Sequence, residues 1–340
     1  MITSATTVLD GPFPPGMLRL GFGCGGLLHG LTRRESLYLL ETALDCGITY
    51  FDTARMYGFG GAEGILGTIV PRNRHRICIA SKAGILPPSR SLLLQIANQT
   101  IKACHKAVPR LRSVMPTLPG LQPRFGIFDL PGLRKSVETS LRELQTDYLD
   151  TLLLHECTAA DVESDEVLYF LQELQKQGKI RKVGIATGIE ETIRIAKARP
   201  LLSEVVQIAS SIWNMNIKRL PPRPGGVTIT HSTLTERFHA LTRELSTNDA
   251  LAKIWRSTIQ IDPQNKVELA RLLLAHALYS NPTGFVLFFS NNPKHIKASA
   301  SVAIDNGVSP DQIRGLEALV KNDERIMCLE KLHRDHLTAS

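Results

Sequence analysis

Short apolar runs and longer amphipathic stretches alternate along most of this 340-residue chain. The short runs are typical of buried strands, and the longer stretches have the spacing of helices that cover one face of a sheet. The predicted strands span 18–22, 48–52, 76–81, 149–154, 182–186, 205–208, 227–230 and 284–288, and the predicted helices span 33–46, 62–70, 133–144, 165–177, 190–198, 266–278 and 294–303. This alternation predicts an α/β fold, a (β/α)8 TIM barrel, as a single domain over residues 1–340.

Several stretches depart from the regular alternation. An insertion at 84–131 follows the third strand; within it, residues 91–107 have an amphipathic pattern, and the surrounding prolines disfavour long elements. The segment NMNIKRLPPRPGG between the sixth and seventh strands is too short for a full crossover helix. After the seventh strand, residues 231–264 are expected to hold a helix at 235–245 and a loop over the barrel mouth. Residues 304–340 form a C-terminal extension.

The glycines Gly21, Gly23 and Gly26 admit a competing interpretation. Their G-x-G-x-x-G spacing after a predicted strand is used by dinucleotide-binding turns in open, doubly wound sheets. In that fold the helix starts inside the glycine motif, whereas a capping box of Thr32 and Glu35 places the helix start six residues after Gly26. We therefore favour a strand-to-helix turn at the mouth of a barrel, and a closed barrel would exclude the open sheet.

Composition and charge narrow the classes of partner. Hydrophobic residues make up 43% of the chain and charged residues 21%, as in ordinary folded proteins. The formal charge of +8 comes without a long basic tail or an RNA-binding aromatic motif, so we expect no nucleic-acid partner. Six scattered cysteines without a CxxC pair indicate reduced thiols, and we expect no metal. No run is long enough to span a bilayer and no secretory leader is recognisable, so we expect a cytoplasmic protein without a membrane partner.

Four polar side chains follow the ends of the second, third and fourth predicted strands. Asp52 ends the second strand and Tyr57 follows on the loop above it, Lys82 follows RICIAS, and His155 follows YLDTLLL. In a barrel, the carboxyl ends of the strands meet at the mouth, where catalytic residues lie. The sequence therefore predicts that these four groups face one another at the mouth.

The motifs G-I-T-Y-F-D-T-A-x-x-Y-G-x-G-x-x-E-x-x-L-G, S-K and Y-L-D-x-L-L-L-H resemble those of the aldo-keto reductases, and the similarity covers roughly residues 16–303. The resemblance implies an oxidoreductase that interconverts a carbonyl group and an alcohol with NAD(P)H, and a catalytic tetrad of Asp52, Tyr57, Lys82 and His155. Lys82, held by Asp52, is expected to lower the pKa of Tyr57, which is about 10 for a free phenol. Tyr57 then exchanges a proton with the substrate oxygen as general acid or base, while His155 orients that oxygen.

The resemblance also indicates where the nicotinamide binds. Gln207 matches the residue that holds the carboxamide, and Thr187 replaces part of the Ser-Asn pair that usually ends the fifth strand. Family members usually stack an aromatic residue on the nicotinamide just beyond the sixth strand, where this chain has Ser210 and Ser211. Trp213 follows them and either takes that role or packs in the barrel wall.

The segment FFSNNPKHIKAS after the eighth strand resembles the family's binding site for the adenosine 2′-phosphate. We assign Ser290, Asn292, His295 and Ser299 to this site. Phe289 stands where many members have Lys, and His295 where Arg is common, which weakens the basic contacts that distinguish NADP from NAD. NADP(H) is the preferred cofactor under this interpretation, and NAD(H) is possible.

A small carbonyl or alcohol molecule is the partner that these expectations require. A cofactor-sensing regulatory or binding subunit is the alternative, because the same barrel is also used in that way. The family sets substrate choice with loops at the mouth, so the sequence predicts neither the substrate nor the oligomeric state. The basic insertion at 84–131 is a solvated loop, a partner-binding segment or a contact for an anionic substrate.

Overall fold

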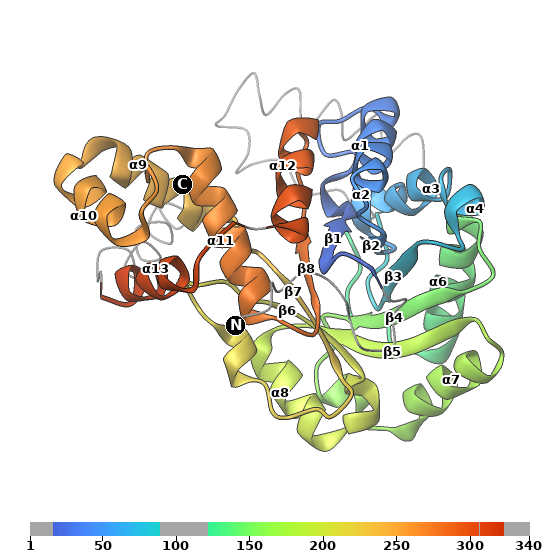
Figure 1. The fold of residues 1–340 in the computed structure, drawn as a ribbon. Coiled ribbons are helices and arrows are strands. Elements are labelled where there is room, and N and C mark those ends of the chain that lie inside the picture. Colours follow the sequence, from blue (N-terminus) through green and yellow to red (C-terminus); the bar gives the residue numbers. More distant parts are fainter. Residues whose placement is uncertain (1–15, 89–121, 306, 323–340) are drawn as a thin grey trace, which may run out of the picture.

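Eight parallel strands close into a barrel in the computed structural model, which describes residues 16–88, 122–305 and 307–322. The strands pair in sequence order, and β1 pairs with β8 to complete the ring (Figure 1). They are β1 (Leu20–Gly23), β2 (Tyr50–Asp52), β3 (Cys78–Ala83), β4 (Leu149–His155), β5 (Ile180–Ala186), β6 (Val205–Ala209), β7 (Val227–His231) and β8 (Phe285–Phe288). The closed order confirms the predicted barrel and excludes the open, doubly wound sheet.

The interior of the barrel is filled by side chains that the strands direct inward. Tyr50 and Phe285 stack with their ring centroids 4.1 Å apart, and Leu287 belongs to the same cluster. Gly21 lies against these side chains, and a Cβ atom on it would come within 2.7 Å of Leu287 and 2.8 Å of Tyr50. Packing inside the barrel therefore explains the first glycine of the G-x-G-x-x-G motif without a phosphate.

Helices cover the outside of the barrel, and the main hydrophobic core lies between the two layers. The helices are α1 (Arg33–Asp45), α2 (Tyr57–Gly60), α3 (Ala62–Leu66), α4 (Val70–Asn73), α6 (Leu130–Leu144), α7 (Asp165–Lys176), α8 (Ile189–Ala198), α9 (Glu236–Thr247), α10 (Asp249–Ile259), α11 (Lys266–Ser280), α12 (Pro293–Ile304) and α13 (Pro310–Asn322). The capping box predicted for α1 is present, since Thr32 and Glu35 each accept a hydrogen bond from the other's backbone N–H.

The helix predicted at 62–70 is divided in the structure into α3 and α4. Gly67 lies at the end of α3, where the backbone of α6 comes close. A Cβ atom on Gly67 would lie 2.1 Å from the carbonyl oxygen of Glu143. The glycine therefore permits the close packing of α6 on this part of the chain.

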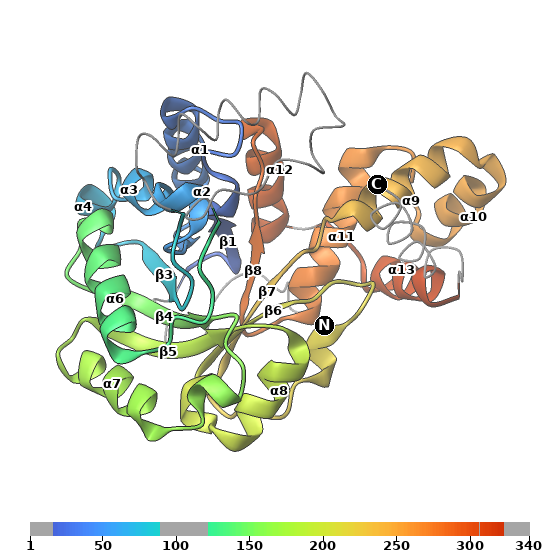
Figure 2. The ribbon, with the colours of Figure 1, turned by 180° about the vertical axis from the view of Figure 1, so that it is seen from behind.

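A second hydrophobic core joins α9, α10, α11 and α13 beside the barrel. Leu241, Trp255, Leu273 and Leu316 are among its buried residues. Figure 1 shows α9, α10 and α13 on one side of the barrel, and Figure 2 shows the same group from behind. The predicted helix at 235–245 corresponds to α9, but α10 lies where a loop was expected, and α13 lies in the predicted C-terminal extension.

The other two irregular stretches are the segment between β6 and β7 and the insertion after β3. Between β6 and β7 the chain forms a short 3-10 helix, η5 (Asn216–Arg219), and no α-helix. Within the insertion after β3, Leu86 and Arg124 form an isolated antiparallel bridge and exchange backbone hydrogen bonds of 2.9 and 3.0 Å. The helix predicted at 91–107 lies outside the described residues.

The described residues also bear on membrane and metal sites. None of their helices has the length and apolar character needed to cross a membrane. Within the same residues, no group of three or more His, Cys, Asp or Glu side chains is arranged to hold a metal ion. Four of the six cysteines fall in this part of the chain, and all four are free thiols.

Candidate active site

Lys82 is the centre of a buried hydrogen-bond cluster at the mouth of the barrel. Its Nζ donates to Asp52 Oδ2 at 2.6 Å, to the carbonyl oxygen of Thr53 at 3.0 Å and to Tyr57 Oη at 3.2 Å. Lys82 and Asp52 are each 2% exposed. Because β2 and β3 run parallel and pair side by side, the end of one strand brings Asp52 next to Lys82 of the other. The structure thus brings three of the four predicted groups into direct contact.

Tyr57 is held above this cluster by a tight turn. The three residues that follow it, Gly58, Phe59 and Gly60, all have positive φ angles, of 57°, 56° and 81°. Two of these positions are glycines, which adopt that backbone conformation readily, whereas Phe59 carries a side chain that disfavours it. A Cβ atom on Gly58 would also lie 3.0 Å from the carbonyl oxygen of Leu27. The turn is therefore strained and closely packed.

Burial and the charge of the main ionic partner act in opposite directions on the pKa of Lys82 and on that of Tyr57. Burial alone would lower the pKa of Lys82, but Asp52 and Tyr57 together outweigh it and raise that pKa above its ordinary value of 10.5. Burial raises the pKa of Tyr57, and the opposing effect of Lys82 is smaller. The sequence-based expectation of a lowered tyrosine pKa therefore holds for the effect of Lys82 but not for the net shift. At neutral pH Lys82 is charged and Tyr57 is protonated.

His155 ends β4 and faces Tyr57. The two ring centroids are 6.0 Å apart and the rings are nearly perpendicular, at 88°. Burial and the Lys82 cation lower the pKa of His155 to about 3, with a smaller effect from His231. The imidazole is therefore neutral at physiological pH and presents a single N–H donor.

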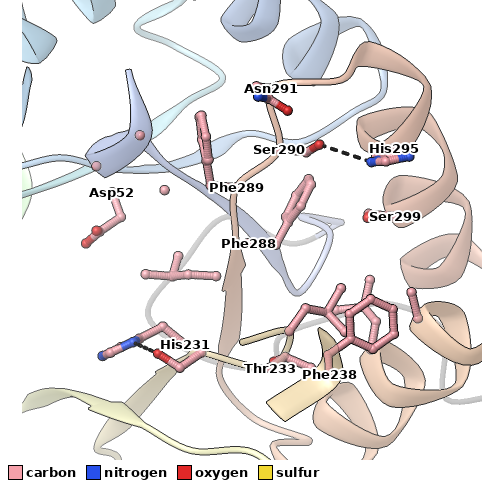
Figure 3. Close-up of a pocket in the computed structure, with 18 of the residues that line it drawn as sticks. Asp52, His231, Thr233, Phe238, Phe288, Phe289, Ser290, Asn291, His295 and Ser299 are labelled. Carbon is pink, nitrogen blue, oxygen red and sulfur yellow. Dashed lines mark hydrogen bonds between the residues drawn. The ribbon is translucent and has the colours of Figure 1, made fainter. Parts of the chain in front are cut away.

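The four groups line a cavity of about 860 Å³ that extends from the strand ends to α12. Figure 3 shows Asp52 and His231 on one side of this cavity and His295 and Ser299, which extend from α12, on the other. Apolar residues such as Phe288 line the space between them. The cavity therefore connects the tetrad with the first turns of α12.

The residues predicted to bind the nicotinamide divide into two groups. Gln207 and Thr187 line the cavity close to the tetrad. The side-chain oxygen of Gln207 is buried and has no hydrogen-bond partner among the described residues. Trp213 does not line the cavity: it is 5% exposed and packs in the core formed by α9, α10, α11 and α13. Of the two roles considered for Trp213, its position favours packing.

The residues predicted to bind the 2′-phosphate lie around the start of α12. Ser290, His295 and Ser299 line the cavity, and Ser290 Oγ is 3.4 Å from His295 Nδ1 (Figure 3). Asn292 is not among the lining residues; its side chain instead caps α12 by accepting from the Lys294 N–H. The neighbouring Asn291 lines the cavity in its place.

Further lining residues were missed from the sequence. His231 ends β7 and residues 232–234 follow it, and the His231 ring lies near the tetrad with its Nδ1 2.7 Å from Ser232 Oγ. Lys266 and Arg271 line the cavity from α11. The rule that polar groups at strand ends face the mouth would have found His231, because it is the last residue of β7. No comparable signal marks the two cations on α11.

Comparisons with known proteins identify the family of this chain. A family model described as the aldo/keto reductase family matches residues 19–224. Probable aldo-keto reductase 1 of Glycine max is 28% identical over 206 residues, which cover 59% of this chain and 50% of the relative. The 6-dehydroglucose reductase of Novosphingobium aromaticivorans is also 28% identical over 206 residues, covering 54% of this chain and 55% of the relative. The chain thus spans about half the length of these curated relatives.

A solved structure extends the similarity over nearly the whole fold. An aldo-keto reductase from Klebsiella pneumoniae, in complex with NADPH, superimposes with a TM-score of 0.64 at 21% identity. The match covers 93% of this chain and 95% of that one. At this level of identity the similarity shows the barrel fold alone.

Proposed function

Because this chain belongs to the aldo/keto reductase family, we propose that it is an NADP(H)-dependent oxidoreductase that interconverts a carbonyl group and an alcohol. The observation that carries the proposal is the buried chain of contacts from Asp52 through Lys82 to Tyr57 at the cavity wall. A phenol that is protonated at neutral pH and hydrogen-bonded to a buried ammonium is suited to donate a proton and then to be stabilised as phenolate.

Each tetrad residue has a separate part in the proposed reaction. Tyr57 donates its hydroxyl proton to the carbonyl oxygen during reduction and accepts it back during oxidation. Lys82 stabilises the phenolate that forms, and Asp52 keeps Lys82 charged and in place. His155, neutral because of its burial, donates a ring N–H to the same oxygen and so orients the substrate.

The residues around the tetrad fit a nicotinamide cofactor. The buried oxygen of Gln207, which has no partner among the described residues, is suited to accept from a carboxamide N–H, and the Thr187 side chain lies beside it in the cavity wall. When bound there, the nicotinamide supplies or accepts the hydride.

The charge distribution of the cavity favours NADP(H) over NAD(H). Its two carboxylates, Asp52 and Glu156, lie at or next to the ends of strands β2 and β4. The lining residues contributed by α11 and α12 include Lys266, Arg271 and His295, and no acid. Neither Lys266 nor Arg271 forms an ion pair with another described residue. Unpaired cations at the mouth of a cavity are suited to an anionic group such as the 2′-phosphate.

The substrate that we propose is a small aldehyde, ketone or sugar. The cavity of about 860 Å³ has to hold the cofactor as well, which limits the space left for the substrate. A curated relative named 6-dehydroglucose reductase is consistent with a carbonyl sugar.

Cofactor oxidation provides the test of this function. Wild-type protein and the Tyr57→Phe variant are assayed with NADPH and with NADH across aldehydes, ketones and sugars. We expect turnover of at least one carbonyl by the wild type, with NADPH preferred, and a loss of about 10²–10⁴-fold in kcat for Tyr57→Phe. Equal activity of the two proteins on every substrate would refute the mechanism. Tight NADPH binding without turnover of any substrate would instead favour a cofactor-sensing subunit.

A further inference from the structure

A second buried ion pair lies behind the tetrad, outside the cavity. Arg55 Nη1 donates to Glu63 Oε2, and Ser81 Oγ donates to the other carboxylate oxygen of Glu63, Oε1, at 2.6 Å. Glu63 has no solvent exposure, Ser81 has none, and Arg55 is 7% exposed. None of the three is among the residues that line the cavity. The cluster is therefore not placed to contact a ligand in that cavity.

The position of these residues in the chain connects them to the catalytic groups. Arg55 lies two residues before Tyr57, and Ser81 is the residue next to Lys82 on β3. Successive side chains of a strand point to opposite faces, so Lys82 points into the barrel mouth while Ser81 points outward to the helix layer. Glu63, in the first turn of α3, meets Ser81 there. One carboxylate thus joins the segment that carries Tyr57 to the strand that carries Lys82.

The turn after Tyr57 contains an unfavourable backbone conformation that the surrounding structure has to stabilise. Phe59 holds a left-handed backbone conformation that is unfavourable for a residue with a side chain. Conformations of this kind persist where the surrounding structure holds them in place. The Gly61 N–H closes the turn by donating to the carbonyl oxygens of Gly58 and Tyr57, and the Tyr57 N–H donates to the Ala54 carbonyl oxygen just before it. The Arg55–Glu63 pair anchors the same segment from its other side.

We propose that Glu63, held between Arg55 and Ser81, is a positioning residue that sets the contact between Tyr57 Oη and Lys82 Nζ. The inference rests on the proposed function, because that contact matters to catalysis only if Tyr57 exchanges the proton. In the proposed role, the Arg55–Glu63–Ser81 cluster keeps the phenol within 3.2 Å of the ammonium. A displacement of this contact by about 1 Å lowers kcat by up to about 100-fold, since proton transfer depends steeply on geometry.

A double substitution separates positioning from stability. Removing one partner of a buried ion pair leaves an uncompensated charge and destabilises the fold, whereas replacing both partners with apolar residues is often neutral. The single variants Arg55→Met and Glu63→Leu are therefore compared with the double variant that carries both changes. The double variant is expected to recover most of the melting temperature that the single variants lose, without recovering kcat; the Ser81 hydroxyl, which loses its acceptor, accounts for the remainder.

A buried carboxylate at the opposite end of the barrel, with partly exposed arginine partners, supplies the control. Asp150, near the start of β4, is 4% exposed and accepts from Arg74 at 2.8 Å and from Arg181 at 3.1 Å. That end of a barrel contributes to stability rather than to catalysis. Arg74→Met is expected to lower the melting temperature and to leave kcat and its pH dependence unchanged.

The pH profile of alcohol oxidation distinguishes positioning from a general loss of stability. Lys82 lowers the pKa of Tyr57, while burial and the neighbouring Asp52 and Cys24 raise it. If the contact with Lys82 lengthens, the pKa of Tyr57 rises, and the pH at which oxidation reaches its plateau moves upward. We expect this shift in Glu63→Leu and in the double variant, a smaller shift in Glu63→Gln, which keeps an acceptor for Ser81, and none in Arg74→Met.

Hydrogen exchange of residues 53–61 gives a readout that needs no substrate. We expect faster amide exchange in this segment for Glu63→Leu and for the double variant, together with an unchanged Kd for NADPH. Wild-type exchange there in the double variant, or a kcat and pH profile that return to wild type with the melting temperature, would overturn the inference. If Tyr57→Phe is fully active, the proposed reaction fails, yet the exchange data still decide whether the cluster holds the turn.

Discussion

Replacing Lys82 with Met tests the electrostatic core of the site. Methionine fills a similar volume but removes the ammonium that donates to Asp52 and to Tyr57. Asp52 then remains buried, at 2% exposure, and its Oδ1 already has no hydrogen-bond partner among the described residues. The variant is therefore expected to lose both stability and activity.

The size of the loss follows from the burial of the Lys82–Asp52 pair. Breaking a buried ion pair from one side lowers the free energy of unfolding by about 3–5 kcal/mol. At about 2.1 cal/mol/K per residue, a chain of 340 residues has an entropy of unfolding of about 0.7 kcal/mol/K. The melting temperature should therefore fall by about 4–7 °C. Loss of the group that stabilises the phenolate should lower kcat by about 10²–10⁴-fold.

Calorimetry and steady-state kinetics measure the two effects separately. Because the pKa of Lys82 is raised above 10.5 in the folded protein, its contribution to stability is complete below that pH and is lost only as the pH rises beyond it. The deficit of Lys82→Met should therefore be the same at pH 7 and pH 9. The double variant Lys82→Met, Asp52→Asn should regain most of the stability and none of the activity. A wild-type melting temperature in the single variant, or wild-type turnover in either, would refute the reasoning.

Four further results follow from the cavity. Gln207→Leu should raise the Kd of NADPH and of NADH alike by about 10-fold in fluorescence titrations, with no loss of melting temperature, because its buried oxygen has no partner without the cofactor. Arg271→Glu should raise the Kd of NADPH by about 10-fold and change that of NADH by less than about 2-fold, an effect that fades at high salt; equal weakening of both cofactors would contradict the proposed phosphate contact. Trp213→Phe should lower the free energy of unfolding by about 1–2 kcal/mol in urea denaturation and leave NADPH binding unchanged, since Trp213 lies outside the cavity. Stopped-flow rates of carbonyl reduction should be constant from pH 5 to pH 8, because the pKa of His155 is about 3 and that of Tyr57 is raised; a fall in rate centred near pH 6.5 would show that a histidine titrates during reduction.

The barrel and its tetrad were accessible from the sequence because each depends on local patterns. An apolar run predicts a buried strand, and a polar residue at its carboxyl end is expected to face the mouth of the barrel. The same rule therefore predicted Asp52, Lys82 and His155 together. Gly21 could be recognised only as part of a G-x-G-x-x-G motif, which fits either a dinucleotide-binding turn or a strand-to-helix turn at the mouth of a barrel. The barrel order decides between them, since Tyr50 and Leu287 occupy the space that a Cβ atom would need.

The remaining parts of the site depend on contacts between distant segments. Lys266 and Arg271 lie on one helix, and their spacing alone does not distinguish a cavity wall from a solvated surface. They reach the cavity because α11 packs against α12 at the end of β8. Trp213 follows β6 closely in sequence, but α9, α10 and α13 form a separate core that encloses it. That core was not predicted, although α10 buries Ala252, Trp255 and Ile259 at helical spacing.

In the proposed mechanism, the protonation states of Tyr57 and His155 near neutral pH suit carbonyl reduction. Burial keeps the Tyr57 hydroxyl protonated and His155 neutral, so both are hydrogen-bond donors toward an oxygen in the cavity before the reaction begins. A carbonyl oxygen that gains negative charge is stabilised by such donors, whereas an alcohol needs one acceptor to lose its proton. If Tyr57 is the acid/base that we propose, oxidation requires its minor, deprotonated form, and Lys82 is the group that makes this form accessible. The hydrogen bond between Lys82 and Tyr57 consequently has more influence on oxidation than on reduction, so variants that lengthen it should slow oxidation more at pH 7 than at pH 10.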